Sequence, residues 1–311
     1  ARGMNNKFEY RKGIISAIII AIGFIYIIRL FTFQIADDEY KDRALNNSRR
    51  TEIQYPARGL IYDRNNRLLV DNQAAYDLIM LPRQVKKFDT TELLETLGIS
   101  REYLERRIAE CKKHSRHKPS ILIPLITGKK FAVLQEKLYR YPGFYIQTRT
   151  MRKYNVKHSG GLFGYLSEVT EKDIARENYY SRGDYAGATG LEKTFEKQLR
   201  GVKGKQVFVV DNLNRIKGSY QNGAEDREAI VGENLYTTLD IDLQDYAVLL
   251  MSNKKGGIVA IEPATGEILA KVTSPGYDPQ FMLGLDRGKN YGQLLNDTLF
   301  PLFDRTTSAQ Y

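Results

Sequence analysis

The chain has 311 residues, enough for about two domains, and its 42% hydrophobic and 27% charged residues are typical of a globular protein. Its net charge of +10 suits nucleic acid or anionic lipid. No zinc-finger cysteine pair, RNA-binding aromatic strand or tryptophan is present, so we expect membrane lipid, and no nucleic acid, as a partner. The single cysteine, Cys111, excludes an intramolecular disulfide.

An apolar run near the N-terminus predicts a membrane-spanning helix over residues 13–35. Residues 13–28 carry no charge, and the run continues beyond Arg29 to about 22 residues, enough to cross about 30 Å of hydrocarbon. Basic residues precede the run and acidic residues follow it. The positive-inside rule therefore places residues 1–12 in the cytoplasm and the rest outside. A cleaved signal peptide and a buried core helix are the alternatives, but the length of the run and its bulky end favour a permanent anchor.

The sequence from Pro56 to Val70 predicts a β-hairpin. Leu60 and Ile61 form one strand, the polar residues 63–66 have turn chemistry, and residues 68–70 return.

The following stretch alternates helix and strand. Thr90 to His117 has apolar residues at helical spacing, and residues 98–100 separate two helices, the second with a solvated cationic face. Residues 128–154 predict a helix and then, from Pro142, a turn and a strand.

Two apparent sites in the second helix are rejected. Cys111, His114 and His117 are spaced three apart, but the surrounding lysines and arginines disfavour a metal cation, so we expect no metal and no other cofactor. Ser115 to Lys118 reads Ser-x-x-Lys, but it lacks the buried strand-to-helix setting of a nucleophile.

A glycine-rich stretch precedes a further helix. Thr189 or Gly190 begins this helix and Gly201 ends it. Its apolar face consists of Leu191, Phe195 and Leu199. The glycines are too irregular for a phosphate-binding loop. Val207–Lys217 and Ser219–Tyr220 then predict strands.

The C-terminal part begins with a strand over Leu235–Leu239. Asp240 and Asp242 are expected to cap the helix 243–251, and their use as an acid–base pair is the weaker interpretation. Residues 257–274 predict an antiparallel hairpin.

Taken in order, these stretches resemble class B penicillin-binding proteins. The first hairpin is similar to the family's Arg-Gly-x-Ile-x-Asp-Arg-Asn-Gly motif, with Asn66 in place of the turn glycine. Residues 152–169 resemble the family's Arg-x-Tyr and the segment after it, with Gly161 at the histidine position. Residues 187–201 resemble Gly-x-x-Gly-Ile-Glu-x-x-Tyr-Glu-x-x-Leu-Arg-Gly. The resemblance implies structural, not catalytic, roles for Arg58, Gly59, Asp63, Arg64, Gly187, Gly190, Glu192, Arg200 and Gly201.

The implied fold is α+β in three parts. A single transmembrane helix leads into an elongated periplasmic pedestal, or dimerisation-like, domain over residues 36–234. Residues 235–311 resemble the first helix and strands of a serine transpeptidase domain, with Val-Ala-Ile-Glu-Pro-x-Thr-Gly-Glu-Ile-Leu-Ala among them. Residues 301–305 resemble the Pro-Leu-x-Asn-Arg that precedes the nucleophile motif Ser-x-x-Lys in this family.

The resemblance implies a D,D-transpeptidase that cross-links peptidoglycan. In the family a serine attacks a D-Ala-D-Ala stem peptide, forms an acyl-enzyme and transfers it to a neighbouring stem, and β-lactams acylate the same serine. The catalytic motifs are missing from this chain, so no catalytic residue is assigned. We expect the chain alone neither to transfer D-Ala peptides nor to be acylated by penicillin.

The elongation-type branch is favoured by the Gly-Asp-Tyr stretch at residues 183–185. It implies a polytopic glycan polymerase of the shape, elongation, division and sporulation family as partner, bound through anchor and pedestal. It also implies the bacterial inner membrane, with the bulk of the protein in the periplasm. The cell-division relative and a non-catalytic membrane scaffold that binds or activates a polymerase are the alternatives.

Overall fold

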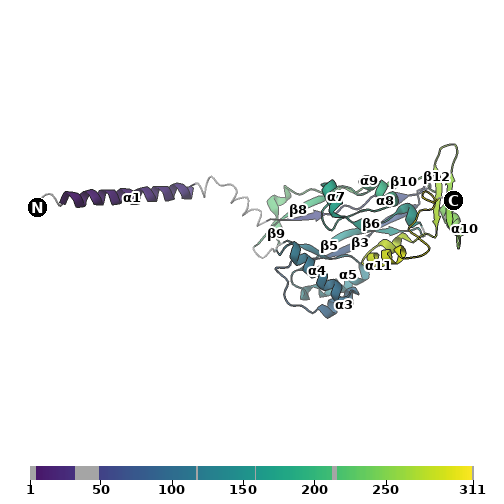
Figure 1. Ribbon diagram of the computed structural model, residues 1–311, viewed down its shortest axis with the longest axis horizontal. Coiled ribbons are helices and arrows are strands. Elements are labelled where there is room, and N and C mark those ends of the chain that lie inside the picture. Colours follow the sequence, from purple (N-terminus) through teal and green to yellow (C-terminus); the bar gives the residue numbers. More distant parts are fainter. Residues whose placement is uncertain (1–4, 32–48, 117, 158, 212–215, 310–311) are drawn as a thin grey trace. The chain divides into compact units, whose positions relative to one another are not determined.

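The computed structural model describes residues 5–31, 49–116, 118–157, 159–211 and 216–309 (Figure 1). The chain divides into two compact units, which are described separately. The first comprises Ala1–Glu52 and Gln206–Asp226, and the second comprises Ile53–Lys205 and Arg227–Tyr311.

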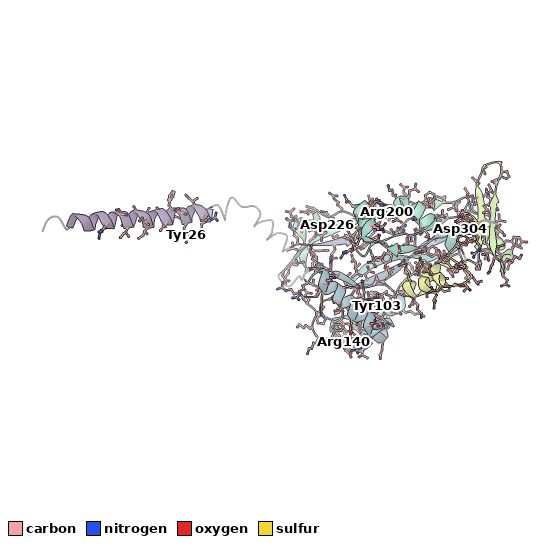
Figure 2. The ribbon with its side chains drawn as sticks, in the orientation of Figure 1. Tyr26, Tyr103, Arg140, Arg200, Asp226 and Asp304 are labelled. Atoms are coloured by element: carbon pink, nitrogen blue, oxygen red, sulfur yellow. The ribbon has the colours of Figure 1, made fainter. Side chains whose placement is uncertain are left out.

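The first unit begins with the long helix α1 (Asn5–Phe31). Within it, Gly13–Leu30 is long and apolar enough to cross a membrane, and none of this segment is buried inside the protein. Figure 2 shows its side chains, including Tyr26, standing out from the helix. The predicted helix is therefore present, while residues 32–35 of the prediction lie outside the described residues.

A three-stranded sheet with the order β1-β8-β9 follows. Its strands are β1 (Arg49–Gln54), β8 (Gly204–Val210) and β9 (Ile216–Ser219). The prediction of one strand over Val207–Lys217 was wrong, because β8 ends at Val210 and Val210 pairs with Ile216 in an antiparallel register. This pairing requires a chain reversal, and the intervening sequence is rich in the turn formers Asp and Asn. Tyr220, also predicted as strand, begins the 3₁₀ helix η3 (Tyr220–Gly223).

The second unit is built on a five-stranded sheet around the 13-residue strand β3 (Leu68–Met80). Strand β5 (Phe144–Tyr154) pairs antiparallel with β3 from Val70 to Met80. Strands β2 (Ile61–Tyr62) and β4 (Ser120–Thr127) also pair antiparallel with β3, and β10 (Leu235–Tyr236) runs parallel to β2.

The predicted hairpin of residues 60–70 is confirmed as β2 and the start of β3. Asn66 has φ 60°, the conformation for which the family uses glycine and which asparagine tolerates. The buried Asp63 stabilises the turn by accepting hydrogen bonds from the amides of Asn65 and Arg67. The predicted strand over residues 235–239 is shorter than expected, because only residues 235 and 236 pair with β2.

Three helices form a lobe against β4: α3 (Thr90–Leu97), α4 (Arg101–His114) and α5 (Gly128–Lys137). The predicted break between the first two is confirmed, since Gly98 adopts the left-handed conformation and Ser100 caps α4. The core of this lobe consists of buried apolar residues, among them Leu93, Leu97, Leu104, Cys111, Leu122 and Ile123.

The prediction that the cationic face of α4 is solvated holds for four of its five basic residues, which are exposed: Arg101, Arg106, Lys112 and Lys113. Arg107 differs, because its guanidinium donates to the backbone carbonyls of Ile121 and Leu122 and so links α4 to β4. The helix also ends at His114 instead of His117.

Short elements connect the sheet to the C-terminal part: α6 (Gly160–Phe163), β6 (Leu166–Glu168), α7 (Glu171–Arg176), β7 (Tyr185–Gly187), α8 (Gly190–Thr194) and α9 (Glu196–Leu199). The predicted single helix from Gly190 is interrupted at Phe195, where φ −104° and ψ 22° leave the helical region. The interruption is invisible in the sequence, because Leu191, Phe195 and Leu199 keep a spacing of four and all pack into one core cluster.

The C-terminal part contains α10 (Ile241–Leu250), β11 (Gly256–Ile261), β12 (Ile268–Ser274), the 3₁₀ helix η4 (Pro279–Met282) and α11 (Arg287–Leu295). The predicted hairpin is confirmed as the antiparallel pair β11–β12. Capping is also confirmed, since the Asp240 carboxylate accepts from the amides of Asp242 and Leu243. Asp242 instead forms an ion pair with Arg67, so only Asp240 caps the helix.

Candidate functional site

The two spacings rejected as metal and nucleophile sites lie at the end of α4 and just beyond it. His114 is exposed, the buried Cys111 Sγ lies 3.6 Å from the carbonyl of Ile121, and burial raises the pKa of this thiol. His117 lies outside the described residues. Within the part of the chain that the structure describes, no three His, Cys, Asp or Glu side chains are grouped to hold a metal. The Ser115 hydroxyl accepts from the amide of Lys118, as in a simple turn.

The chain contains a second Ser-x-x-Lys spacing that the pattern analysis overlooked, from Ser252 to Lys255. Both residues are exposed in the turn after α10. The setting lacks the burial that a serine nucleophile needs.

A buried ionic network centred on Glu192 brings together residues from three distant segments. The Glu192 carboxylate is fully buried and receives Arg58 Nη2 at 2.7 Å and Arg152 Nε at 2.6 Å. Burial opposes ionisation, but the two guanidiniums lower the pKa of Glu192 below its ordinary value. The carboxylate is therefore held ionised inside the protein.

Arg58 and Arg152 also bind the strand edges beside them. Arg152 donates to the carbonyl of Gly59 at 2.8 Å and to the side chain of Asn72 at 3.0 Å. Asn72 in turn donates to the carbonyl of Arg58 at 2.6 Å. The network thus joins β3, β5 and the segment before β2 to helix α8.

Glu196 extends the network toward the surface. It accepts two hydrogen bonds from Arg58, at 3.1 and 2.7 Å, and one from the amide of Gly187 at 2.8 Å. The hydroxyl of Tyr180 donates to the same carboxylate, and Arg200 donates to that hydroxyl at 3.1 Å. Arg200 also forms an ion pair with Glu177 at 2.5 Å.

The glycines singled out in the sequence lie where backbones meet closely. A Cβ on Gly59 would lie 1.8 Å from the carbonyl oxygen of Glu233, and one on Gly187 would lie 2.2 Å from that of Glu192. Gly190 and Gly201 have φ of +60° and +68°, backbone angles that residues with a side chain rarely adopt.

The remaining two predicted residues lie in the hairpin turn. Asp63 is buried, as described above, whereas Arg64 is partly exposed and reaches Glu267 in the β11–β12 turn at 3.5 Å. The amide of Arg64 also donates to the carbonyl of Leu239 at 2.9 Å. The hairpin therefore contacts the C-terminal part directly.

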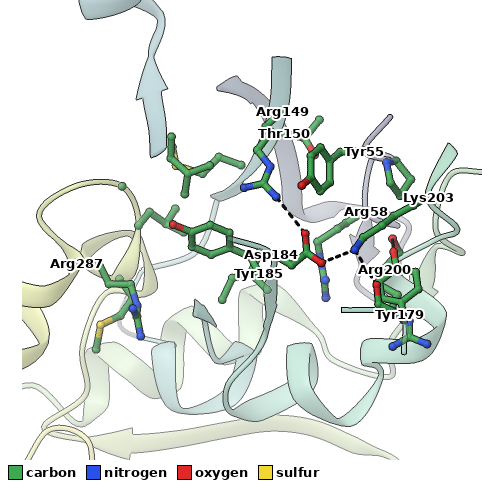
Figure 3. A pocket seen from close by; sticks show the side chains of 17 residues that line it. Tyr55, Arg58, Arg149, Thr150, Tyr179, Asp184, Tyr185, Arg200, Lys203 and Arg287 are labelled. Carbon is green, nitrogen blue, oxygen red and sulfur yellow. Dashed lines mark hydrogen bonds and ion pairs between the residues drawn. The ribbon is translucent and has the colours of Figure 1, made fainter. Parts of the chain in front are cut away.

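A pocket with a cavity volume of about 80 Å³ opens beside the network (Figure 3). One side is apolar, and the other carries tyrosines and charged groups. The polar and charged lining residues include Tyr55, Arg58, Arg149, Tyr179, Asp184, Tyr185, Arg200, Lys203 and Arg287. The pocket lies wholly within the second unit.

A second buried ionic cluster forms the charged wall of this pocket. Arg149 pairs with Asp77 at 3.0 Å and with Asp184 at 3.7 Å, and Lys203 pairs with the same Asp184 carboxylate. Burial raises the pKa of Asp77, although Arg149 opposes the rise. Burial also raises the pKa of Tyr55 to about 12, so that its ring, 3.9 Å below the Arg149 guanidinium, stays neutral.

Most members of these clusters were not predicted from the sequence. Arg152 and Glu196 were quoted within motifs without a role, and Asp77, Arg149 and Asp184 were not singled out as site residues. Arg149, a charged residue inside the strand predicted after Pro142, was the available signal, because an ionised side chain facing a core requires a partner. Asp77 lay beyond the residues predicted as strand.

The C-terminal part contains one further ion pair, between Lys271 on β12 and Asp304 at 2.9 Å. Partial burial opposes ionisation, yet hydrogen bonds from Lys271 and Thr306 lower the pKa of Asp304 to about 2. This contact fastens the segment after α11 to β12.

Comparison with known proteins identifies the domain that holds both ionic clusters. The sequence family described as the penicillin-binding protein dimerisation domain matches residues 53–237. The chain is similar to the peptidoglycan D,D-transpeptidase MrdA of Acinetobacter baumannii, with 32% identity over 290 residues that cover 88% of this chain and 41% of that protein. MrdA of Escherichia coli K12 is 30% identical over 302 residues, covering 92% and 46%.

A solved complex of penicillin-binding protein PBP2 with MreC from Helicobacter pylori has a related fold. Its similarity has a TM-score of 0.61 at 22% identity and covers 83% of this chain and 49% of that one. The chain therefore spans about half the length of the relatives it matches. The predicted α+β architecture is confirmed.

Proposed function

Because the chain belongs to the family defined by the penicillin-binding protein dimerisation domain, we propose that the protein acts as a peptidoglycan D,D-transpeptidase of the elongation type. The observation that carries the proposal is the similarity to MrdA proteins, which runs through both the dimerisation domain and the C-terminal part. The non-catalytic scaffold is the second candidate.

The proposed reaction follows from the family chemistry. A serine outside residues 1–311 would attack the D-Ala-D-Ala end of a stem peptide, with a lysine taking its proton, and the acyl-enzyme would pass to the amine of a neighbouring stem. Backbone amides would stabilise the oxyanion. The residues described here would support that site. Helix α10 and the hairpin of β11 and β12 would begin the catalytic domain, and Arg64 reaches Glu267 in the turn between β11 and β12.

The two ionic clusters give the dimerisation domain a mechanical role in this proposal. Glu192 and its arginines join four segments of the second unit, and Arg64 and Arg67 reach the C-terminal part of the same unit. A domain fixed in this way can hold the C-terminal part of the same unit in a defined position. The proposed boundaries remain residues 13–35 for the anchor, 36–234 for the pedestal and 235–311 for the start of the catalytic domain.

Partners and orientation are part of the same proposal. A glycan polymerase of the shape, elongation, division and sporulation family would bind anchor and pedestal, and an MreC-type protein would bind as it does in the related PBP2 complex. The candidate span Gly13–Leu30 would cross the bacterial inner membrane with its N-terminus in the cytoplasm, because the basic residues lie before it.

Labelling of the native gene product with fluorescent penicillin, followed by intact mass measurement, tests the proposal. We expect one covalent penicillin per protein, with no label after excess unlabelled penicillin. A native product that stays unlabelled but co-purifies with a polymerase would overturn the enzyme assignment and support the scaffold.

A further inference from the structure

We propose that the pocket between β5, β7 and α11 binds the carboxyl end of a short peptide. Most of its lining comes from the range that matches the dimerisation domain, while Met282 to Gly284 and Arg287 come from the C-terminal part, and nothing in the proposed transpeptidase reaction uses it. Its volume of about 80 Å³ exceeds by several times the roughly 10–15 Å³ that one water requires on the same measure. It can therefore admit a group of several heavy atoms.

The two walls of the pocket select an amphipathic ligand. Leu125, Leu166, Met282 and Leu283 supply apolar surface on one side. The rings of Tyr55 and Tyr185 lie among the charged groups on the other, and Figure 3 shows the Tyr185 ring between Arg287 and Asp184. A short aliphatic body would contact the apolar wall and the Tyr185 ring while polar ends reach opposite sides.

Arg287 is the group that selects a carboxylate. The other four cations of the lining already pair with carboxylates: Arg58 with Glu192, Arg149 with Asp77, Arg200 with Glu177 and Lys203 with Asp184. Arg287 has no carboxylate partner among the described residues. Its guanidinium lies 5.5 Å from the Tyr165 ring and hydrogen-bonds the Tyr165 side chain, and its Nε is buried without a hydrogen-bond partner. Arginine binds carboxylates through paired N–H donors, so a guanidinium whose charge no carboxylate compensates matches one carboxylate.

Asp184 supplies a complementary acceptor. The side chain is almost fully buried. Its Oδ1 lies 3.7 Å from Arg149 and accepts no hydrogen bond of normal length, while its other oxygen accepts from the amide of Ser181 at 2.6 Å and from Lys203. A ligand with an N–H donor at one end and a carboxylate at the other would engage both groups. A peptide C-terminus has this arrangement. Phosphate is less suitable, because the Asp184 carboxylate would repel it.

The test uses the 311-residue chain in detergent micelles and calorimetric titration with N-acetyl-alanylalanine and with its C-terminal amide. We expect the acid to bind and the amide to bind at least about tenfold more weakly, because the charge-assisted hydrogen bonds to Arg287 are lost. Arg287→Gln should weaken binding of the acid by a similar factor, and Arg287→Lys should restore part of it. Lys289→Gln, on an exposed residue of the same helix outside the pocket, should change nothing.

A second variant separates pocket occupancy from charge. Leu283→Trp should fill the apolar side and abolish binding with Arg287 intact, and unchanged thermal unfolding of each variant would show that it is folded. Equal binding of acid and amide, undiminished binding by Arg287→Gln, or no saturation up to about 10 mM would overturn the proposal. So would binding of inorganic phosphate, but not the dipeptide, with the same dependence on Arg287. None of these outcomes bears on penicillin labelling.

Discussion

The helical lobe and the Glu192 network belong to the same compact unit but are held together by different physical means. In the lobe, α3, α4 and α5 bury leucines at regular helical spacing against β4. In the network, one fully buried carboxylate compensates two arginines, Arg58 in the segment before β2 and Arg152 on β5. Apolar packing tolerates partial loss of contact, whereas a buried ion that loses its partner retains the full cost of desolvation. The two regions should therefore respond differently to single substitutions.

The strongest test removes the charge at the centre of the network. Glu192→Gln leaves Arg152 with no carboxylate partner, although Arg58 keeps Glu196. We expect the free energy of unfolding to fall by about 4 kcal/mol, because an uncompensated charge remains buried. Urea unfolding measures the change. The matched control is Glu171→Gln, which breaks the exposed pair with Arg182 and should have almost no effect. A loss below about 1 kcal/mol in Glu192→Gln would remove the distinction between the two regions.

The corresponding test in the lobe is Leu97→Ala. Leu97 is completely buried at the end of α3, and truncation should cost about 3 kcal/mol through lost burial and the cavity left behind. Hydrogen exchange should show faster opening of α3–α5 while the Arg58–Glu192 segments keep their protection. Val133→Ala, on an exposed residue of α5, serves as the control. Uniform loss of protection throughout the second unit would show that lobe and network unfold together.

A pH titration probes a third, half-buried ion pair, between Lys271 and Asp304. The pKa of Asp304 is lowered to about 2 from an ordinary value of 3.8, so its stabilising contribution is complete above pH 3.8 and is lost as the pH falls toward 2. NMR titration of the carboxyl carbon measures this pKa directly. Lys271→Met should raise it toward the ordinary value, and Lys289→Met should not. An unchanged pKa in Lys271→Met would assign the shift to the hydrogen bonds from Thr306 instead.

The smallest effect is expected at the exposed pair of Arg67 and Asp242. Their separation is 2.5 Å, shorter than either ion pair of Glu192, but both side chains are more than half exposed. Arg67→Ala should change the free energy of unfolding far less than Glu192→Gln does, because water screens the pair. Urea unfolding against the parent chain checks the value. A loss as large as that of Glu192→Gln would mean that distance, not burial, decides how much these ion pairs contribute to the free energy of unfolding.

The sequence was informative where structure is local. The spacing from Leu93 to Cys111 and the stop at Gly98 predicted two helices, and the polar turn at Asp63 predicted the hairpin, because each pattern depends on neighbours in the chain. The kink at Phe195 was missed, since the apolar spacing continues through it. The strand boundary at Val210 was missed although the turn formers Asp and Asn follow it in the sequence.

The candidate site was predicted less well for a physical reason. Arg58 and Glu192 were noted through family motifs, but their ion pair joins residues 134 apart, and no local pattern indicates which arginine meets which carboxylate. Arg149 and Asp184 form their pair only once β5 and β7 are in place. The pocket likewise depends on Arg287, which comes from a separate helix.

The pairing of β2 with β10 has a consequence for synthesis. The amide of Leu60 binds the side chain of Asn234, 174 residues later, and Ile61 pairs with Leu235. A ribosome delivers residues in order, so the edge of β2 stays open for as long as the intervening residues take to emerge, at about 5–20 residues per second. Contacts of such long range also form slowly in the complete chain. Newly made protein therefore passes through an interval in which the unpaired edge of β2 is accessible to chaperones.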